Sequence, residues 1–310
     1  MTIVLPTSVN IVEVGPRDGF QMETIFIPTD LKVEVINRVA RAGVRKIEAT
    51  SFVNPKVIPQ MADSDDVMRR IERLPSVEYA ALIPNVRGAR RAVEAGADSL
   101  RLVLCCSETY NKRNVGMSVR QSVEQAREIL GIAAGARVKA EVTLALAFGC
   151  PFEGFVPEDR VVVLAHELAE MGFEEICIAD SIGVANPVLM KRMMTRLAPD
   201  IGERAHLSLH LHDTRGLGLA NVVAALECGI DTFDASLGGL GGCPIMVGGT
   251  GNIPTEGVVN LCEELGVVTG IDIGGIQAAA RLLQDFLGRE LPSPVLKSGT
   301  RAQLFERIGS

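Results

Sequence analysis

The chain has 310 residues, of which 47% are hydrophobic and 22% charged, a composition typical of a globular protein that can bury a large core. Its net charge of −7 and its pI near 5.3 argue against a nucleic-acid partner, because binding to a phosphate backbone needs a basic field. No apolar run approaches the roughly 18–20 residues of a membrane span, and the first residues lack the regions of a signal peptide. We therefore expect a cytoplasmic protein with no membrane partner.

The seven cysteines include the adjacent pair Cys105 and Cys106 and show no C-x-x-C spacing. An odd number of scattered cysteines in a cytoplasmic chain indicates reduced thiols rather than a disulfide framework.

Eight short segments rich in Val, Ile, Leu and Ala recur along the chain, and each is followed by a stretch that can form a helix. They lie at 9–15, 46–52, 79–84, 99–106, 138–147, 174–180, 206–213 and 232–237. One face of the helix predicted at 157–171 carries apolar residues at helical spacing: Val161, Leu164, Ala165 and Leu168. Repeated strand–helix units predict an α/β fold with a parallel sheet, and a count of eight favours a closed (β/α)8 TIM barrel over an open doubly wound sheet.

The domain organisation follows from the end of the repeats. We expect residues 1–269 to form a TIM-barrel catalytic domain and residues 270–310 to form a C-terminal helical extension packed on the barrel. Two helices are predicted in the extension, near 274–287 and 300–308. They would cap the barrel or carry a contact between subunits, so a homo-oligomer, a dimer or larger, is expected.

Two histidines stand in the run HLSLHLHDTRGLGLAN. In the strand predicted at 206–214, three leucines alternate with Ser208, His210 and His212, which places the leucines on one face and the polar side chains on the other. His210 and His212 would then present two imidazoles side by side, which is half of a metal site. The pattern alone fits a pair of hydrogen-bonded core histidines equally well.

Other polar residues fall at the carboxyl ends of the predicted strands, where TIM-barrel active sites lie. Arg17 and Asp18 follow the first strand, Glu48 lies in the second, and Asp180 ends the sixth. Burial of these charges is costly unless they are paired or functional. An ion-pair network could explain Glu48 or Asp180 individually, but it does not explain two histidines that converge with Asp18.

Two imidazoles, the carboxylate of Asp18 and the amide of Asn252 would form a mixed nitrogen and oxygen ligand set. Such a set suits Mg²⁺ or Mn²⁺ in near-octahedral geometry, with positions left open for a substrate. The segment 238–252 contains seven glycines in fifteen residues, too many for a packed element and typical of a mobile lid. Cys243 in its middle is either an ordinary surface thiol or a proton donor or acceptor carried over the site.

Five ordered motifs together resemble the 3-hydroxy-3-methylglutaryl-CoA (HMG-CoA) lyase family over roughly residues 8–290. They are VEVGPRDGFQ, IEATSFVNPKVIPQMAD, FGCPFEG, LHLHDTRGLGLAN and GLGGCPIMVGGTGNIPTE. The resemblance implies a metal-dependent (β/α)8 carbon–carbon lyase. It places the metal ligands on Asp18, His210, His212 and Asn252, the catalytic arginine on Arg17, supporting acids on Glu48 and Asp180, and the mobile-loop cysteine on Cys243.

The implied reaction is the retro-Claisen cleavage of HMG-CoA to acetyl-CoA and acetoacetate. Asp18 or His210 would take the hydroxyl proton, Arg17 would stabilise the thioester enolate, and Cys243 would protonate the departing carbon. Four cations on neighbouring loops could meet the CoA phosphates, although each could equally be a solvated surface charge: Lys56, Arg87, Lys112 and Arg113.

The chain departs from the family pattern at two places. After Cys243 and Pro244 it has Ile245, Met246 and Val247 where the family usually has an aromatic residue followed by small ones, and Gly257 stands where Asp is usual. A related 3-hydroxy-acyl-CoA with a different C3 substituent is therefore an alternative substrate. An aldolase or Claisen-type enzyme of the same superfamily, and a catalytically silent barrel that binds a ligand, are the remaining alternatives.

Overall fold

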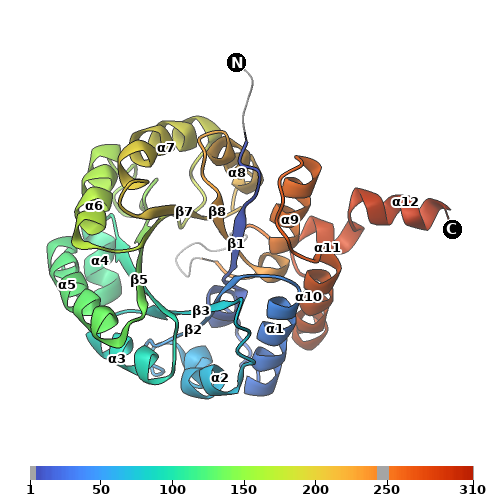
Figure 1. Ribbon diagram of the computed structural model, residues 1–310, viewed down its shortest axis with the longest axis horizontal. Helices are drawn as coiled ribbons and strands as arrows, with labels where there is room; N and C mark the ends of the chain where they lie inside the picture. Colours follow the sequence, from blue (N-terminus) through green and yellow to red (C-terminus); the bar gives the residue numbers. More distant parts are fainter. Residues whose placement is uncertain (1–4, 243–250, 310) are drawn as a thin grey trace.

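The computed structural model describes residues 5–242 and 251–309, and its centre is a closed barrel of eight parallel strands (Figure 1). Each strand pairs with the next, and β8 closes the barrel by pairing with β1. The strands are β1 (Asn10–Glu13), β2 (Lys46–Ser51), β3 (Glu78–Ile83), β4 (Ser99–Cys105), β5 (Lys139–Ala145), β6 (Glu175–Asp180), β7 (His206–Leu211) and β8 (Thr232–Ala235). Every expected strand segment overlaps one of them. The predicted TIM barrel is confirmed, and the open sheet is wrong.

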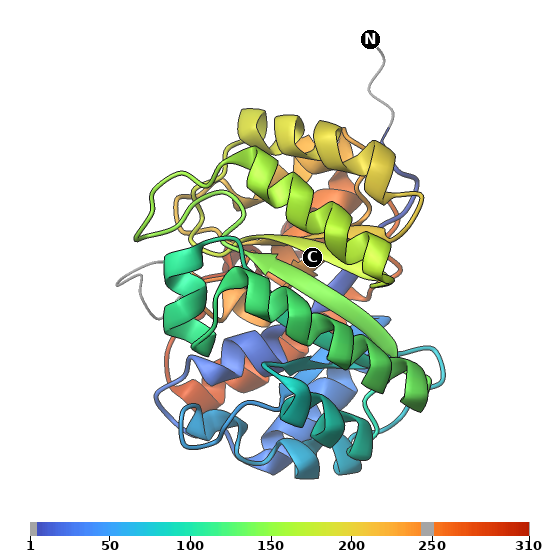
Figure 2. The same cartoon turned by 90° about the vertical axis from the view of Figure 1, so that its left-hand side faces the viewer.

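Helices surround the barrel in both views (Figures 1 and 2). They are α1 (Thr29–Arg41), α2 (Ser64–Arg70), α3 (Val86–Glu94), α4 (Glu108–Val115), α5 (Val119–Ala136), α6 (Glu158–Met171), α7 (Pro187–Ile201), α8 (Gly218–Leu226), α9 (Thr255–Glu264), α10 (Ile273–Leu287), α11 (Pro294–Ser298) and α12 (Arg301–Gly309). In α6 the apolar positions expected from the 3.6-residue period are buried, and Gly172 ends the helix in a left-handed conformation at φ 105°.

Three short helical turns lie in the described loops between strands and helices. A π-helical turn, η1 (Gly15–Gly19), follows β1, and 3₁₀ turns form η2 (Pro59–Met61) and η3 (Leu237–Gly239). The turns η1 and η3 contact each other, and both follow the carboxyl ends of their strands. They belong to the end of the barrel at which the sequence predicts the site.

The C-terminal helices differ in how they meet the barrel. Helix α10 packs against α1 and α9, whereas α12 projects away from the ring of helices (Figure 1). The start of α12 is held by a hydrogen bond of 2.9 Å between the amides of Gln303 and Gln277, and by an ion pair of 3.0 Å between Arg301 and Glu264. The short helix α11 was not predicted, because its five residues are too few to show a period. Among the described residues, no helix combines the length and apolar character needed to cross a membrane.

Candidate active site

Asp18, His210 and His212 form a buried cluster whose potential ligand atoms all lie within 4.8 Å of one another. The two Nε2 atoms of the histidines are 3.0 Å apart, and Nε2 of His210 lies 3.9 Å from Oδ2 of Asp18. The three residues come from opposite ends of the sequence, and closure of the barrel brings them together.

The strand β7 positions the histidines as its alternation predicts. Leu209 and Leu211 are fully buried on one face, while Ser208 and His210 point to the barrel interior, where Ser208 Oγ donates a hydrogen bond of 2.6 Å to Glu175. His212 follows directly after the strand.

Asn252 reaches the cluster because the chain after the glycine-rich segment runs antiparallel to the end of β7. His212 and Asn252 form a β-bridge. Backbone hydrogen bonds flank the bridge, from Asp213 N to Gly251 O at 3.0 Å and from Ile253 N to Leu211 O at 3.1 Å. These backbone bonds therefore bring the Asn252 side chain to the cluster.

Asp18 is carried by η1, a π-helical turn with Pro16 in its first turn. The carboxylate of Glu13 holds this turn, since it accepts hydrogen bonds of 2.7 Å from Gly15 N and 2.9 Å from Leu237 N. A π-turn is rare and is often found at functional sites. It directs Asp18 toward His210 and Arg17 toward Glu48.

The side chain of Asn252 tests whether the site fits a metal ion. Its Nδ2 donates hydrogen bonds of 2.7 Å to Asp18 Oδ2 and 3.0 Å to Leu240 O. Its Oδ1 is buried and has no hydrogen-bond partner among the described atoms. A buried carbonyl oxygen without a donor is costly unless a cation satisfies it. Together with one carboxylate and two imidazoles it makes the mixed set that Mg²⁺ or Mn²⁺ accepts.

Arg17 lies beside the cluster and is oriented by two carboxylates. Its Nε and Nη2 donate to Glu48 at 2.9 and 3.0 Å, and its Nη1 bonds Asp18. Burial alone would raise the pKa of Asp18, but the charges of Arg17, His210 and His212 together with the hydrogen bond from Asn252 outweigh it and hold that pKa below its ordinary value. The guanidinium is thereby fixed in one plane at the rim of the site.

Asp180 makes its contacts away from the cluster. Its carboxylate accepts hydrogen bonds of 2.9 Å from the backbone N–H groups of Val184 and Ala185. Burial raises its pKa despite these donors. Its neighbours Ala179 and Ser181 line the cavity in front of the histidines, so Asp180 shapes the loop after β6.

A cavity of about 510 Å³ opens in front of the cluster. It is lined by Arg17, Asp18, His210, His212 and Asp234 together with less polar residues that include Val57, Ile58, Val103 and Tyr110. A cavity of this size with few, convergent polar groups is typical of a small-molecule site.

The four cations expected near the CoA phosphates are all exposed, in segments that follow the carboxyl ends of β2, β3 and β4. Lys56 directly precedes Val57 of the cavity wall. Arg87 lies in the first turn of α3. Lys112 pairs with Glu108 at 3.4 Å, and the Arg113 guanidinium stacks 4.2 Å above the ring of Phe152.

The glycine-rich segment is partly packed, contrary to expectation. Its start, Gly238 to Leu240, is buried and overlaps η3. Cys243 and the residues Ile245, Met246 and Val247 lie outside the described residues. None of the six described cysteines forms a disulfide.

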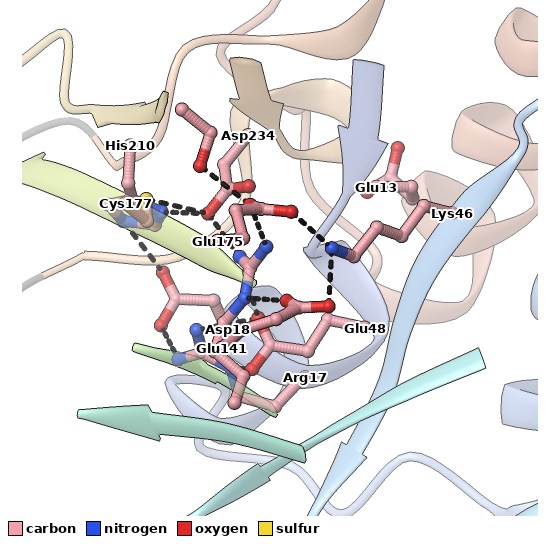
Figure 3. Close-up of polar contacts among 12 residues, drawn as sticks. Glu13, Arg17, Asp18, Lys46, Glu48, Glu141, Glu175, Cys177, His210 and Asp234 are labelled. Atoms are coloured by element: carbon pink, nitrogen blue, oxygen red, sulfur yellow. Dashed lines mark hydrogen bonds and ion pairs between the residues drawn. The ribbon is translucent and has the colours of Figure 1, made fainter. Parts of the chain in front are cut away.

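Sequence reasoning missed two residues that the structure places behind the histidines. Nδ1 of His210 donates a hydrogen bond of 3.0 Å to Oδ2 of Asp234 (Figure 3). Arg101 Nη1 donates one of 2.7 Å to the same oxygen. The signal that could have found them is a single charge inside each of two buried strands, SLRLVLC and TFDA.

Comparison with known proteins agrees with this geometry. A family model described as HMGL-like matches residues 8–283. The chain belongs to this family. Two relatives are each 40% identical to it: an HMG-CoA lyase from Bacillus subtilis, over 93% of this chain and 96% of the relative, and a mitochondrial HMG-CoA lyase from Rattus norvegicus, over 95% and 90%. The resemblance seen in the five motifs is thus confirmed over nearly the whole chain.

Solved structures of HMGL-like proteins superpose closely on the barrel. An HMG-CoA lyase from Acinetobacter baumannii, in complex with coenzyme A and 3-methylmalate, is 44% identical with a TM-score of 0.91, covering 95% of this chain and 96% of that one. The Bacillus subtilis HMG-CoA lyase structure is 39% identical with a TM-score of 0.92, covering 97% and 99%. The fold of this chain and the fold of the family are the same.

Proposed function

We propose that the protein is a metal-dependent carbon–carbon lyase that cleaves HMG-CoA to acetyl-CoA and acetoacetate. The observation that carries this proposal is the convergence of Asp18, His210 and His212 beside Arg17 at the cavity. The 40% identity to HMG-CoA lyases over almost the entire chain supports the same reaction.

The ion would be Mg²⁺ or Mn²⁺, held by Asp18, His210, His212 and Asn252. When bound it supplies Lewis-acid polarisation of substrate oxygens and so lowers the pKa of the C3 hydroxyl. The free Oδ1 of Asn252 and the facing Nε2 atoms of the histidines support this ligand set.

The protein's own residues would then handle protons and charge. Asp18 or His210 would take the hydroxyl proton; Nδ1 of His210 is held by Asp234, and the carboxylate of Asp18 is held by Arg17 and Asn252. As the C2–C3 bond breaks, C3 becomes a ketone carbon and the electron pair passes into the thioester enolate. Arg17, fixed by Glu48, would stabilise the enolate oxygen, and Cys243 would return a proton to C2.

The remaining site residues have supporting roles in this proposal. Asp180 would hold the loop after β6, through its bonds to Val184 and Ala185. The CoA phosphates would meet exposed cations around the cavity mouth. This assignment is supported by their positions, because each lies in a segment that follows a strand's carboxyl end: Lys56, Arg87, Lys112 and Arg113.

A substrate panel tests the reaction. The metal-loaded protein is incubated with HMG-CoA, with thioesters bearing bulkier C3 substituents, and with free hydroxy-oxo acids, and the products are identified by mass spectrometry. We expect acetyl-CoA and acetoacetate from HMG-CoA with the highest kcat/KM. Preference for a bulkier thioester would select the alternative substrate, and cleavage of a free acid alone would select an aldolase. Lack of any cleavage would contradict the proposal.

A homo-oligomer is a further part of this proposal, and the face of α12 supports it. Leu304, Phe305 and Ile308 are all exposed on this projecting helix, and apolar residues in that setting are typical of a contact between subunits. Light scattering after chromatography should give a dimer or larger for the wild type and a smaller species for Phe305→Asp. A monomeric wild type would contradict this assignment.

A further inference from the structure

A column of buried charges fills the barrel interior behind the cluster, and Arg101 of β4 lies at its centre. Arg101 is only 1% exposed. Its guanidinium donates to Asp234 at 2.7 Å, to Glu141 at 3.1 Å and to Glu175 at 3.1 Å, and it approaches Glu48 to 3.8 Å. Figure 3 shows these carboxylates pointing toward one another from different strands.

Asp234 connects Arg101 to His210, one of the proposed metal ligands. Oδ2 of Asp234 receives hydrogen bonds from both Arg101 Nη1 and His210 Nδ1. The other oxygen of Asp234, Oδ1, is buried and has no hydrogen-bond partner among the described atoms. The orientation of this carboxylate therefore depends on the bonds at Oδ2, and among these Arg101 supplies the charged one.

Glu48 connects Arg101 to Arg17 on the other side of the cavity. The same Nη1 of Arg101 lies 3.8 Å from Oε2 of Glu48, which accepts from Nη2 of Arg17. A single guanidinium nitrogen thus faces both the carboxylate behind His210 and the carboxylate behind Arg17.

The remaining nitrogens of Arg101 fix its own orientation. Nε and Nη2 are held by Glu141 and Glu175, and both of these acids also pair with Lys46 at 2.6 Å. Lys46 begins β2 at the amino end of the barrel, far along the strands from the histidines. A planar fork with several donors can serve all these carboxylates at once, whereas a point charge cannot.

We infer that Arg101 is a positioning residue of the active site: by holding Asp234 and Glu48 together, it sets both the orientation of the His210 ring and the plane of the Arg17 guanidinium. The inference rests on the metal site proposed above. Partners behind a metal-bound histidine orient its ring, and their loss costs roughly 10–100-fold in metal affinity.

The test compares Arg101→Met and Arg101→Lys with Lys46→Met. Lys46→Met removes a cation from the same buried network but contacts neither Asp234 nor Glu48, so it is the matched control for lost stability. Mn²⁺ affinity is measured by electron paramagnetic resonance, the visible spectrum of bound Co²⁺ reports ligand geometry, and thermal unfolding reports stability. Both Arg101 variants should bind Mn²⁺ roughly 10–100-fold more weakly with an altered Co²⁺ spectrum. Lys46→Met should lower Tm and leave affinity and spectrum unchanged.

A steady-state kinetic measurement separates the effect of Arg101 on Arg17 from its effect on His210. At saturating Mn²⁺ the Arg101 variants should still show a reduced kcat with little change in KM, because Arg17 has lost its alignment. If Arg101→Met does not fold, Mn²⁺ affinity is compared among Arg101→Lys, Asp234→Asn and the double variant that carries both substitutions. The double variant should lose little more affinity than Asp234→Asn alone, since both substitutions act on His210 through the same carboxylate.

The outcomes distinguish the inference from the site on which it rests. A wild-type protein that binds no Mn²⁺ overturns the proposed metal site. A wild type that binds Mn²⁺, with Arg101 variants that match Lys46→Met in affinity, spectrum and kcat, overturns the positioning role of Arg101 alone. Fully additive losses in the double variant also contradict it.

Discussion

His210 and His212 face each other through their Nε2 atoms at 3.0 Å, inside a buried site that also contains a carboxylate. Two cationic imidazoles at this distance would repel each other strongly. Burial, and then the neighbouring His210, lower the pKa of His212 to about 3, so this ring is neutral and available as a ligand at physiological pH.

Removal of one imidazole ring should strongly weaken metal binding. In His210→Ala the cluster keeps one imidazole. The loss of Mn²⁺ affinity should therefore exceed the roughly 10–100-fold loss that follows removal of a residue that only hydrogen-bonds a metal ligand. Isothermal titration measures it. His206→Ala is the control, because His206 lies on the same strand but is half-exposed at its opposite end. Equal affinities of the two variants would be incompatible with the metal site.

Arg17→Lys should have a much lower kcat although the substitution is formally conservative. A lysine ammonium cannot reproduce the two-point bond to Glu48 that orients the guanidinium. Loss of one oxyanion donor typically lowers kcat on the order of 10²–10³-fold, and we expect a loss of this size with Mn²⁺ affinity retained. Unchanged kcat would remove Arg17 from enolate stabilisation.

Two adjacent glycines should respond differently to alanine. At Gly241 the φ is +108°, and an added Cβ would lie 2.4 Å from Nδ2 of Asn252. Gly241→Ala should displace Asn252, weaken Mn²⁺ binding and destabilise the fold by about 1–2 kcal/mol from backbone strain. At Gly242 no described atom lies within 4 Å of an added Cβ. Gly242→Ala should match the wild type, and equal Mn²⁺ affinity of both variants would count against Asn252 as a ligand.

Stability should fall as the pH rises through neutrality, because of Glu13. Burial raises the pKa of Glu13 to about 8, although three hydrogen bonds oppose this shift. Between its ordinary pKa near 4.5 and a pH of about 8, the folded state holds a proton that the unfolded state has lost. The free energy of unfolding should therefore decrease with rising pH, by about 1.4 kcal/mol per pH unit for this group.

Glu13→Gln tests this pH dependence, since the amide keeps the shape of the acid but does not titrate. Urea unfolding from pH 5.5 to 7.5 should show a shallower pH slope in Glu13→Gln than in the wild type. Substitution of the exposed Glu203 by Gln should leave the wild-type slope unchanged. Parallel slopes in all three proteins would show that Glu13 is ionised when folded.

Cys243 provides the last prediction, which comes from its place in the motif GLGGCP. Cys243→Ser should bind Mn²⁺ and acyl-CoA normally but turn over much more slowly, because a hydroxyl is a far weaker acid than a thiol. Alkylation mapped by mass spectrometry should modify Cys243 in the free protein and be slowed by a substrate analogue with Mn²⁺. Full kcat in Cys243→Ser would rule out its role as proton donor.

The barrel could be predicted because each of its strands and helices is indicated by a pattern in a short stretch of sequence. Apolar runs of strand length, helices with a 3.6-residue period and glycines at helix ends are visible without knowledge of distant contacts. The alternation that placed His210 and His212 on one face is equally local, and the residues at strand ends follow from the general position of TIM-barrel sites.

The π-turn η1 and the pairings within the Arg101 network could not be predicted, because partners from distant strands create them. The turn depends on Glu13, which is held by Leu237 N and by the hydroxyl of Thr255 at 2.6 Å. Asp234 becomes a partner of His210 only once β7 and β8 are paired, with His210 opposite Asp234. No period in the sequence encodes such pairs.

The bond between Asn252 and Asp18 has a consequence for the order of assembly. Asp18 follows β1 and Asn252 follows β8, the two strands whose pairing closes the barrel. During synthesis, a nascent chain would expose Asp18 and both histidines before the amide had left the ribosome, so it could hold an ion only loosely. Tight metal uptake would then mark the last folding step, and dissociation of the ion would have to precede or accompany the opening of the barrel at this seam.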